Sequence, residues 1–531
     1  MDPDGRADAP SGVATFRGHV LGAVVVATVA CVIAWRSPDW AADDAYIVAR
    51  YASNLARHGT YAWNLDGPPV EGITGQALAF LETVAVVLRV DPVAFARALG
   101  VGSLVAGAWA TSALAWALRP SLTFAIVAGV AFSLVGEHAP HVRSGLETEF
   151  WIATNLVAAW AFLRATRPVE PKSGAFFVTL VALVVTRPEG MAVALFLSAA
   201  WFVANGARAA TGVRWSLLRR WAFAFVVPVA ILTLARAAHF HALLPNTFHA
   251  KRGTPNSEFV DDVLAMLLAG PRDFLLLGAW AAFVTRDARR PIGEESRSVP
   301  RVGLLLLVAL GVVFATTVAY GSRDLVMNYG RRFAMHVLPW IVVAILVAMV
   351  PVVDVIRSQG TRWRGPFVLA TILSLLAFVH DSAGAREAAS SSAIDRGKNA
   401  GPRNVEAAAW LRANVRPDAT LACYPDAGLL PYASGLRAID FGKLNDATLA
   451  RPGVTPEAVS GYFYERNPDV LSLWRRANGR PYDDGATRIV EDPRFREYLP
   501  GWSWAQVDGS GLFLYVKRGA WAKGPESSRV P

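Results

Sequence analysis

The sequence is poor in cysteine and in charge. Its 531 residues include only two cysteines, Cys31 in an apolar run and Cys423 in a polar C-terminal region, so no disulfide framework is expected. Charged residues make up 18% of the chain, against about 25% in soluble domains. The sequence also contains no Walker phosphate loop, dinucleotide fingerprint or metalloprotease motif. These absences exclude a disulfide-stapled scaffold and do not fit an ordinary soluble domain.

Long apolar runs account for the low charge. Hydrophobic residues make up 53% of the chain, and a membrane span needs about 20 largely apolar residues. The pattern predicts a polytopic α-helical membrane protein with about 11 spans. The first run has no small-residue cleavage site, so we interpret it as an anchor and not as a removed signal peptide. The predicted spans are 19–35, 97–118, 122–137, 149–165, 174–187, 190–204, 217–238, 271–286, 301–320, 333–356 and 366–383.

Arginine and lysine collect in four loops, and an excess of this kind is typical of cytoplasmic loops. The net charge of +10 is then mostly this bias, so no nucleic-acid partner is expected. A crossing at 76–90 would reverse every later loop, so we predict a helix there that lies in or dips into the outer leaflet. The basic loops are 164–174, 205–220, 285–301 and 357–365, and the predicted outer connections are 141–149, 186–190, 239–253 and 321–333.

The character of the sequence changes after residue 383. Residues 1–383 would form the membrane domain, 384–404 a polar linker, and 405–531 a small α/β domain. This domain follows an odd number of spans, so we expect it on the extracytoplasmic side. The pattern predicts a helix at 405–415, strands at 419–424 and 437–441, and a hairpin at 504–518 around Asp-Gly-Ser-Gly.

Asp43 and Asp44 stand side by side just after the first span. They begin a segment of the first outer loop, residues 36–96, that is longer and richer in polar and aromatic residues than a plain connection needs. Such carboxylates could orient or deprotonate a hydroxyl. Cations from other outer loops, or a divalent metal ion whose ligands the sequence leaves unknown, could stabilise a departing phosphate. Alternatively, one aspartate simply caps the helix that begins at Ala45.

Further ionisable residues fall in the predicted outer loops, and at membrane depth such groups favour a functional interpretation. Structural alternatives stay open, with Arg331 and Arg332 as interfacial anchors and Arg187 with Glu189 as an ion pair. Three histidines in one outer loop lack the fixed spacing of a metal site. These histidines are His239, His241 and His249, and the other candidates are Glu71, Glu147, Glu149, Lys251 and Arg252.

Several blocks resemble, in order, those of a bacterial GT-C membrane glycosyltransferase group. DDAYIVARYASNLARHGTYAWN…VEGITG, within 43–75, is similar to that group's DDAYIxFRYxxNLxxGxGxxxN…VEGYTN. The group includes the mycobacterial terminal arabinofuranosyltransferase and the flagellar motor control protein family. The later blocks are SGLETEFW at 144–151, TRPEG at 186–190, LPNTFHAK at 244–251, YGRRF at 329–333 and YPDAGLLPYASGLRAIDFGKLND at 424–446.

The resemblance implies a GT-C fold with a juxtamembrane helix in the first loop. It also implies that Asp43 and Asp44 are catalytic, one of them as the acceptor base. Residues matching the family blocks, or next to them, become candidates for binding the donor phosphate or sugar. These are Arg50, Glu71, Thr74, Glu147, Arg187, Glu189, Asn246, His249, Lys251, Arg331 and Arg332. The sequence departs from the group at Ala49, Ile73, Gly75 and His249, and these differences bear on the donor sugar.

From these features we expect a multi-pass protein of the cytoplasmic membrane. It would transfer a sugar from a polyprenyl-phosphate donor to an envelope glycan or lipid on the outer side, as an arabinofuranosyltransferase does. An alternative is a non-enzymatic flippase or assembly factor for lipid-linked glycans, which would need the cationic site but not the aspartate pair. A third is a ligase or polymerase that uses pyrophosphate-linked oligosaccharides.

Overall fold

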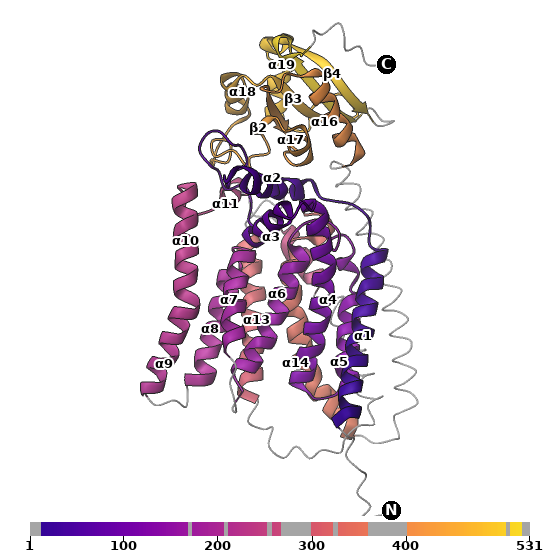
Figure 1. Cartoon of the computed structure of the whole chain (residues 1–531), viewed down its shortest axis with the longest axis vertical. Helices are drawn as coiled ribbons and strands as arrows, with labels where there is room; N and C mark the ends of the chain where they lie inside the picture. The colour runs from indigo at the N-terminus through magenta and orange to yellow at the C-terminus, as the bar shows by residue number, and fades with distance from the viewer. Residues whose placement is uncertain are drawn as a thin grey trace, which may run out of the picture.

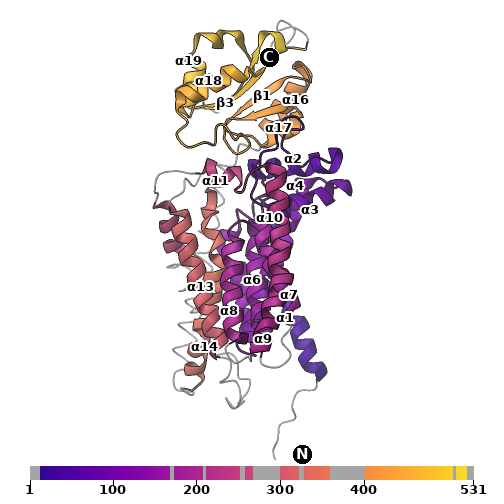
Figure 2. The same cartoon turned by 90° about the vertical axis from the view of Figure 1, so that its left-hand side faces the viewer.

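The computed structural model describes residues 12–167, 173–206, 211–251, 257–266, 299–321, 328–358, 401–505 and 510–522. A helical bundle and a sheet domain follow each other along the long axis of the molecule (Figure 1). The N-terminal end of α1 (Gly12–Arg36) lies far from the sheet domain. In contrast, α2 (Asp43–His58), α3 (Gln76–Val87) and α11 (Asn246–Ala250) lie at the end of the bundle that meets it (Figure 2).

Apolar, alanine-rich helices form the bundle around buried rings such as Trp151, Phe162, Trp201 and Trp340. Small residues let membrane helices approach closely, and buried alanines occur throughout the contacting helices α4 and α6. The bundle helices after α1 are α4 (Pro92–Leu118), α5 (Leu122–Leu134), α6 (Thr148–Ala165), α7 (Gly174–Thr186), α8 (Gly190–Gly206), α9 (Thr211–Trp221), α10 (Val227–Phe240), α13 (Val299–Tyr320) and α14 (Leu338–Ser358). A π-helical turn, Ala222–Val226, joins α9 to α10.

Four helices within the described ranges are long and apolar enough to cross a membrane, and a bent pair makes a fifth if it counts as one span. The four are Gly18–Arg36, Pro92–Leu118, Gly212–Phe240 and Arg301–Tyr320, and the pair is Tyr329–His336 with Leu338–Val350, bent by 59°. α5, α7 and α8 are apolar but shorter. The predicted spans 271–286 and 366–383 lie outside the described residues. The count of 11 spans therefore stays a prediction.

The short helix predicted at 76–90 is confirmed as α3. Its 12 residues extend about 18 Å at 1.5 Å per residue, too short for a crossing. Phe80, Val84 and Val87 are exposed on one side, whereas Leu78 is buried on the other. An exposed apolar face at the rim of the bundle suits contact with lipid. The depth of α3 in the outer leaflet stays a prediction.

The sheet domain has five strands in the order β2-β1-β3-β5-β4. β1 is parallel to β2 and β3, and β5 is antiparallel to β3 and β4. Side chains alternate between the two faces: Leu421 and Cys423 pack toward α16, and Ala422 and Tyr424 toward α18 and α19. The elements are α16 (Pro402–Asn414), β1 (Thr420–Tyr424), α17 (Leu429–Ser434), β2 (Arg437–Asp440), α18 (Pro456–Arg466), β3 (Val470–Arg475), α19 (Asp484–Glu491), β4 (Tyr498–Ala505) and β5 (Gly511–Lys517).

The predicted helix at 405–415, the first two strands and the hairpin strands are confirmed as α16, β1, β2, β4 and β5. β3, α17, α18 and α19 were not predicted. Residues 384–400 of the predicted linker and 506–509 of the hairpin lie outside the described residues.

The first loop and the sheet domain share one hydrophobic core. Ile47, Val48, Tyr51 and Trp63 belong to the same buried cluster as apolar residues of α16 and of the strands. Two glycines permit close contact: a Cβ on Gly428 would lie 1.9 Å from the Asp43 carbonyl oxygen, and one on Gly72 would lie 1.9 Å from Asn445 Oδ1. Gly428 faces backbone, so only a residue without a Cβ fits there, whereas a Cβ at position 72 would have to displace the Asn445 side chain.

Arg50 ties the two parts together. Its buried guanidinium donates to the backbone oxygens of Trp63 (2.6 Å), Pro431 (2.6 Å) and Leu436 (2.9 Å). It also donates to Asn64 Oδ1 at 3.1 Å, and Asn64 itself donates to the Ala438 carbonyl at 2.8 Å. Every nitrogen of Arg50 is therefore used between the first loop and the sheet domain.

Replacing Arg50 with alanine should loosen the sheet domain from the bundle. Three buried carbonyls would lose a charged donor, and each such loss costs about 1–3 kcal/mol. We expect a lower Tm for purified Arg50→Ala and faster limited proteolysis between the two parts. Arg57→Ala, which changes an exposed arginine of the same helix, is the control and should leave both unchanged. Equal behaviour of the two variants would contradict the role of Arg50.

Candidate functional site

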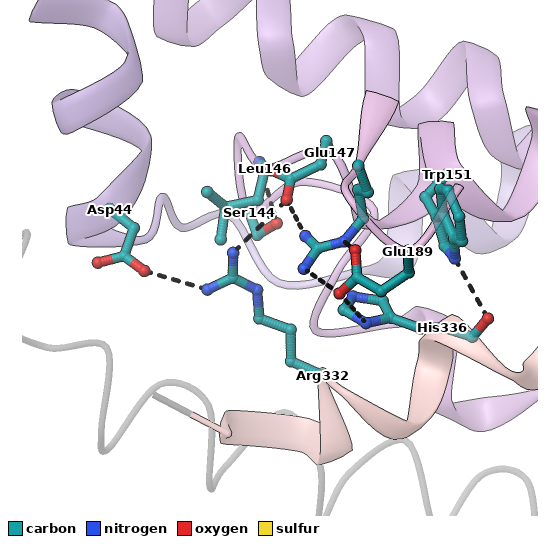
Figure 3. A network of polar contacts seen from close by, with 9 residues as sticks. Asp44, Ser144, Leu146, Glu147, Trp151, Glu189, Arg332 and His336 are labelled. Carbon is teal, nitrogen blue, oxygen red and sulfur yellow. Dashed lines mark hydrogen bonds and ion pairs between the residues drawn. The ribbon is translucent and has the colours of Figure 1, made fainter. Parts of the chain in front are cut away.

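Five of the predicted outer loops meet at the end of the bundle below α2, and their charged side chains form a cluster, most of which Figure 3 shows. We define the charged cluster as Asp44, Glu147, Arg187, Glu189, Lys251 and Arg332. Three of these side chains are acidic and three are basic, so the cluster is close to neutral as a whole. All six were predicted as site residues from the sequence, and they come from five loops.

Arg187 anchors the cluster. The chain leaves the helix at this residue, because α7 ends at Thr186 and Arg187 is extended. Its guanidinium is 2% exposed and donates to Glu147 Oε1 and, at 3.3 and 3.2 Å, to the two oxygens of Glu189. Burial alone would raise the pKa of Glu147, but Arg187 and then Arg332 hold this pKa below its usual value. Arg187 is thus fully committed to the two carboxylates.

Arg332 connects this anchored pair to the first loop. Its Nη1 lies 3.1 Å from Asp44 Oδ2, and its Nη2 lies 3.9 Å from Glu147 Oε1. The Asp44 side chain is 22% exposed, in contrast to the 3% of Glu147. Asp44 and Glu189, whose side chain is 20% exposed beside Arg187, therefore both combine a cationic partner with access from outside, and Asp44 is the one of the two that lies in the first loop.

Lys251 adds a third cation. Its ammonium lies 4.8 Å from the ring centre of Phe333. Burial, followed by the positive charges of Arg332 and Arg187, lowers the pKa of Lys251 to about 8, although Asp44 and Glu189 oppose this shift. Lys251 therefore sits close enough to both arginines for their charges to repel it.

His336 and Trp151 border the cluster and were not predicted. His336 is 1% exposed, its Nδ1 lies 3.9 Å from Glu189 Oε1, and its carbonyl accepts from Trp151 Nε1 at 3.2 Å. The histidine follows YGRRF in a run that is otherwise apolar. A polar residue at the start of such a run was the only sequence signal for it.

Asp43 faces away from the cluster. Its carboxylate accepts from the backbone N–H groups of Gly428 at 2.7 Å and Leu429 at 2.9 Å, at the start of α17. The side chain is buried. Burial first, and then the negative charge of Asp44, raise the pKa of Asp43 to about 6. The structure thus gives Asp43 a capping contact, but with a helix of the sheet domain and not with the helix that follows it.

Other predicted site residues lie beside the cluster and connect the loops. Glu71 accepts from Gln76 Nε2 at 2.6 Å and from Arg236 of α10. Asn246 donates to the carbonyls of Lys443, Leu444 and Asp446 at 3.0, 2.8 and 3.3 Å. These contacts hold the first loop, α10 and the sheet domain in register.

Four more predicted residues are not brought into the cluster. The guanidinium of Arg50 donates its hydrogen bonds to the first loop and the sheet domain. Arg331 is 43% exposed and pairs with Asp262 at 3.3 Å and Glu137 at 3.8 Å. Thr74 is half-buried beside Gly75, and the His249 ring packs on Phe248 at 5.6 Å. Arg50 and Arg331 were expected to bind the donor phosphate or sugar. In the structure their guanidinium groups instead contact backbone carbonyls and carboxylates outside the cluster.

The described residues contain no group of three or more His, Cys, Asp or Glu side chains that could hold a metal ion. His239 contacts the Tyr61 carbonyl at 2.7 Å, and His241 is the left-handed residue that ends α10. The charged cluster combines carboxylates with arginines, which suits binding of an anion better than binding of a cation. The structure therefore gives no argument for a divalent metal among these residues.

A family model described as "Domain of unknown function (DUF8728)" matches residues 393–520, a region that contains the sheet domain. A comparison with curated protein sequences gives no match. Solved structures match over nearly the whole chain. ArnT from Cupriavidus metallidurans bound to undecaprenyl phosphate aligns over 95% of this chain and 98% of that one, with 13% identity and a TM-score of 0.54.

Two other solved structures agree with this match. The oligosaccharyltransferase of Archaeoglobus fulgidus, tethered with an acceptor peptide, aligns over 93% of this chain and 74% of that one, with 13% identity and a TM-score of 0.53. Arabinofuranosyltransferase AftD from Mycobacteria aligns over 94% of this chain, with 15% identity and a TM-score of 0.51, and the chain spans 40% of its length. The chain has the GT-C fold. This assigns a polytopic membrane domain and a C-terminal sheet domain to it, and at such low identity the likeness extends to the fold alone.

In this GT-C fold the burial of Asp43 predicts a pH-dependent stability, because burial raises its pKa although the hydrogen bonds from Leu429 and Gly428 lower it. The raised pKa means that folded Asp43 holds its proton more tightly than unfolded Asp43, so its contribution to stability is lost as pH rises. From about pH 4 to about pH 6, wild type should lose up to about 3 kcal/mol relative to Asp43→Asn, since one pKa unit is about 1.4 kcal/mol. Tm measured against pH in detergent would show this difference.

Asp418→Asn controls for the change in net charge, because Asp418 is an exposed aspartate of the sheet domain. Parallel Tm curves for wild type and Asp43→Asn across this range would mean that folding does not raise the pKa of Asp43.

Proposed function

We propose that the protein is a membrane glycosyltransferase that transfers a sugar from a polyprenyl-phosphate donor to an envelope glycan or lipid. The observation that carries this proposal is the partly exposed Asp44 carboxylate beside Arg332 and Lys251, at the end of the bundle that meets the sheet domain. A GT-C fold bound to undecaprenyl phosphate in ArnT supports the lipid-phosphate donor. The positive-inside pattern supports the cytoplasmic membrane, with this end and the sheet domain outside.

Asp44 would act as the general base. It would take the proton of an acceptor hydroxyl as the hydroxyl oxygen bonds to the anomeric carbon of the donor sugar. The bond between that carbon and the phosphate oxygen would break, and polyprenyl phosphate would leave with the electron pair. Arg332 and Lys251 would stabilise the negative charge on the departing phosphate.

The fixed members of the cluster would position these groups. Arg187 is held by Glu147 and Glu189, and Glu147 also lies 3.9 Å from Arg332 Nη2. A guanidinium held by carboxylates on several sides has little freedom to turn away. Asp43 would position α2 through its contact with α17 and would not take the proton, so the adjacent aspartates would have separate roles.

The first test is sugar transfer from a panel of labelled polyprenyl-phosphate monosaccharides to extracted envelope glycans. An arabinofuranosyl donor belongs in the panel because AftD is one of the structural matches. Asp44→Asn should lower kcat by about 10²–10⁴-fold, the usual contribution of a general base, and should still bind donor. Asp43→Asn should keep most of its turnover at a temperature where it remains folded.

Full turnover by Asp44→Asn, or loss of turnover only in Asp43→Asn, would overturn the assignment of the base. Donor binding without turnover by wild type, in the presence of a competent acceptor, would favour a non-enzymatic flippase or assembly factor.

The lowered pKa of Lys251 predicts weaker donor binding in mild alkali. Lys251 loses its positive charge as pH rises through about 8, while a phosphodiester keeps its negative charge. The KM for the donor should therefore rise above this pH in wild type. In Lys251→Arg the KM should stay flat, because arginine remains protonated. The same rise in both proteins would assign the pH dependence to another group.

A further inference from the structure

A polar seam runs between the first loop and the sheet domain, away from the charged cluster. It consists of two adjacent cavities. The first, of about 360 Å³, lies among residues 62–70, β2 and the C-terminal end of α18. The second, of about 480 Å³, lies between the second half of α2 and α17. Asn64, Asp66 and Arg437 line both cavities, so the seam is continuous past them.

The lining of the seam combines donors and acceptors of hydrogen bonds. Arg466 and Glu465 lie on the side of the first cavity, and Arg57 on the side of the second. Arg437 and Asp66 stand between them, 3.7 Å apart and 48% and 68% exposed. Sugar hydroxyls both donate and accept hydrogen bonds, so a lining of this kind suits a polyhydroxylated chain. It does not suit an apolar lipid tail, and the two carboxylates disfavour nucleic acid.

Partly buried hydrogen bonds hold the walls of the seam in place. Asn64 donates to the Ala438 carbonyl at 2.8 Å and accepts from the Ala438 N–H at 3.2 Å. On the other wall, the Tyr462 hydroxyl donates to Asp446 Oδ2 at 2.7 Å, and Asp446 Oδ1 accepts from the Thr448 N–H at 2.9 Å. A wall formed before binding lowers the entropy cost of holding a flexible ligand.

Helix α2 connects the seam to the charged cluster. Asp44 lies in its first turn and Arg57 in its last, which puts their backbones about 20 Å apart at 1.5 Å per residue. Asp44 at the first end of α2 pairs with Arg332, and Arg57 and His58 at its last turn line the second cavity. A ligand with one end at Asp44 would need to be an extended chain in order to fill the seam.

We infer that the seam binds the non-reacting part of an extended saccharide acceptor whose reacting end lies at Asp44. This inference rests on the proposed function. Arg437 and Asp66 contact the chain in its middle, Arg466 and Glu465 contact it in the first cavity, and Arg57 contacts it in the second. The protein therefore prefers long acceptor glycans to short ones of the same sugar and linkage.

Equilibrium binding tests this inference without requiring turnover. Envelope glycan is released, tagged with a fluorophore at one end and separated by size, and its anisotropy is measured with the full-length protein in lipid nanodiscs. We expect the long fraction to bind wild type more tightly than the short fraction. Arg437→Ala should raise the Kd for the long fraction about tenfold, the loss of about 1.4 kcal/mol, with little change for the short one.

Single-cavity variants sharpen the test. Arg466→Ala and Arg57→Ala should each weaken binding of the long fraction, and the double variant should weaken it further. Arg451→Ala, an exposed arginine of the sheet domain that lines neither cavity, is the matched control and should bind as wild type. Thermal unfolding of each variant checks that the fold is intact.

Equal binding of short and long fractions by wild type would overturn the inference, as would equal losses in Arg451→Ala and Arg437→Ala. Transfer to short acceptors together with length-independent binding would keep the proposed function and remove only the seam. Length-dependent binding without transfer of sugar from any donor would support the seam as a glycan-binding site and contradict the proposed transferase function.

Discussion

The buried guanidinium of Arg50 is the contact on which the arrangement around the site depends. It satisfies three backbone carbonyls from two distant parts of the chain, and no neutral side chain of similar size carries five donors. Because Arg50 projects from the middle of α2, its contacts fix the rotation of that helix. Neighbouring residues of a helix point about 100° apart. The same rotation therefore directs Asp43 toward α17 and Asp44 toward Arg332.

Electrostatics explains why the cluster can exist beside an apolar bundle. A single charge there would be costly, and pairing with an opposite charge offsets that cost. Arg187 and Glu147 are almost fully buried and neutralise each other, whereas Asp44 keeps access from outside. The buried pair fixes the geometry, and the accessible residues remain available for a ligand. This division between fixed and accessible charges is the physical basis of the proposed roles.

The sequence indicated which loops form the site but not which partners their individual side chains contact. Asp44, Glu147, Arg187, Glu189, Lys251 and Arg332 were all predicted, because charges in otherwise apolar surroundings stand out. The separation of Asp43 from Asp44 could not be predicted, since the partner of Asp43 is 385 positions away in the chain. The role of Arg50 was missed for the same reason: Pro431 is 381 positions from it.

The secondary structure divides in a similar way between elements that the local sequence predicts and elements that it does not. Helix α3 and the hairpin strands carry short-range signals and were predicted, whereas β3 reads as an ordinary apolar run until its neighbours β1 and β5 are known. The predicted count of spans depends on segments outside the described residues, which neither support nor contradict it.

The core shared by the first loop and the sheet domain has a consequence for biosynthesis. A ribosome makes α2 early and residues 420–446 near the end, and domains generally fold as units in that order. Until the late segment reaches the same side of the membrane, Arg50 and Asp43 have none of their sheet-domain partners, and α2 lacks the contacts that set its rotation. A chain interrupted before residues 420–446 are made would contain every charged residue of the cluster. Its helix α2 would still lack the contacts that direct Asp44 toward Arg332. Under the proposed function, completion of the last domain would therefore be needed before the chain could act on a lipid-linked sugar.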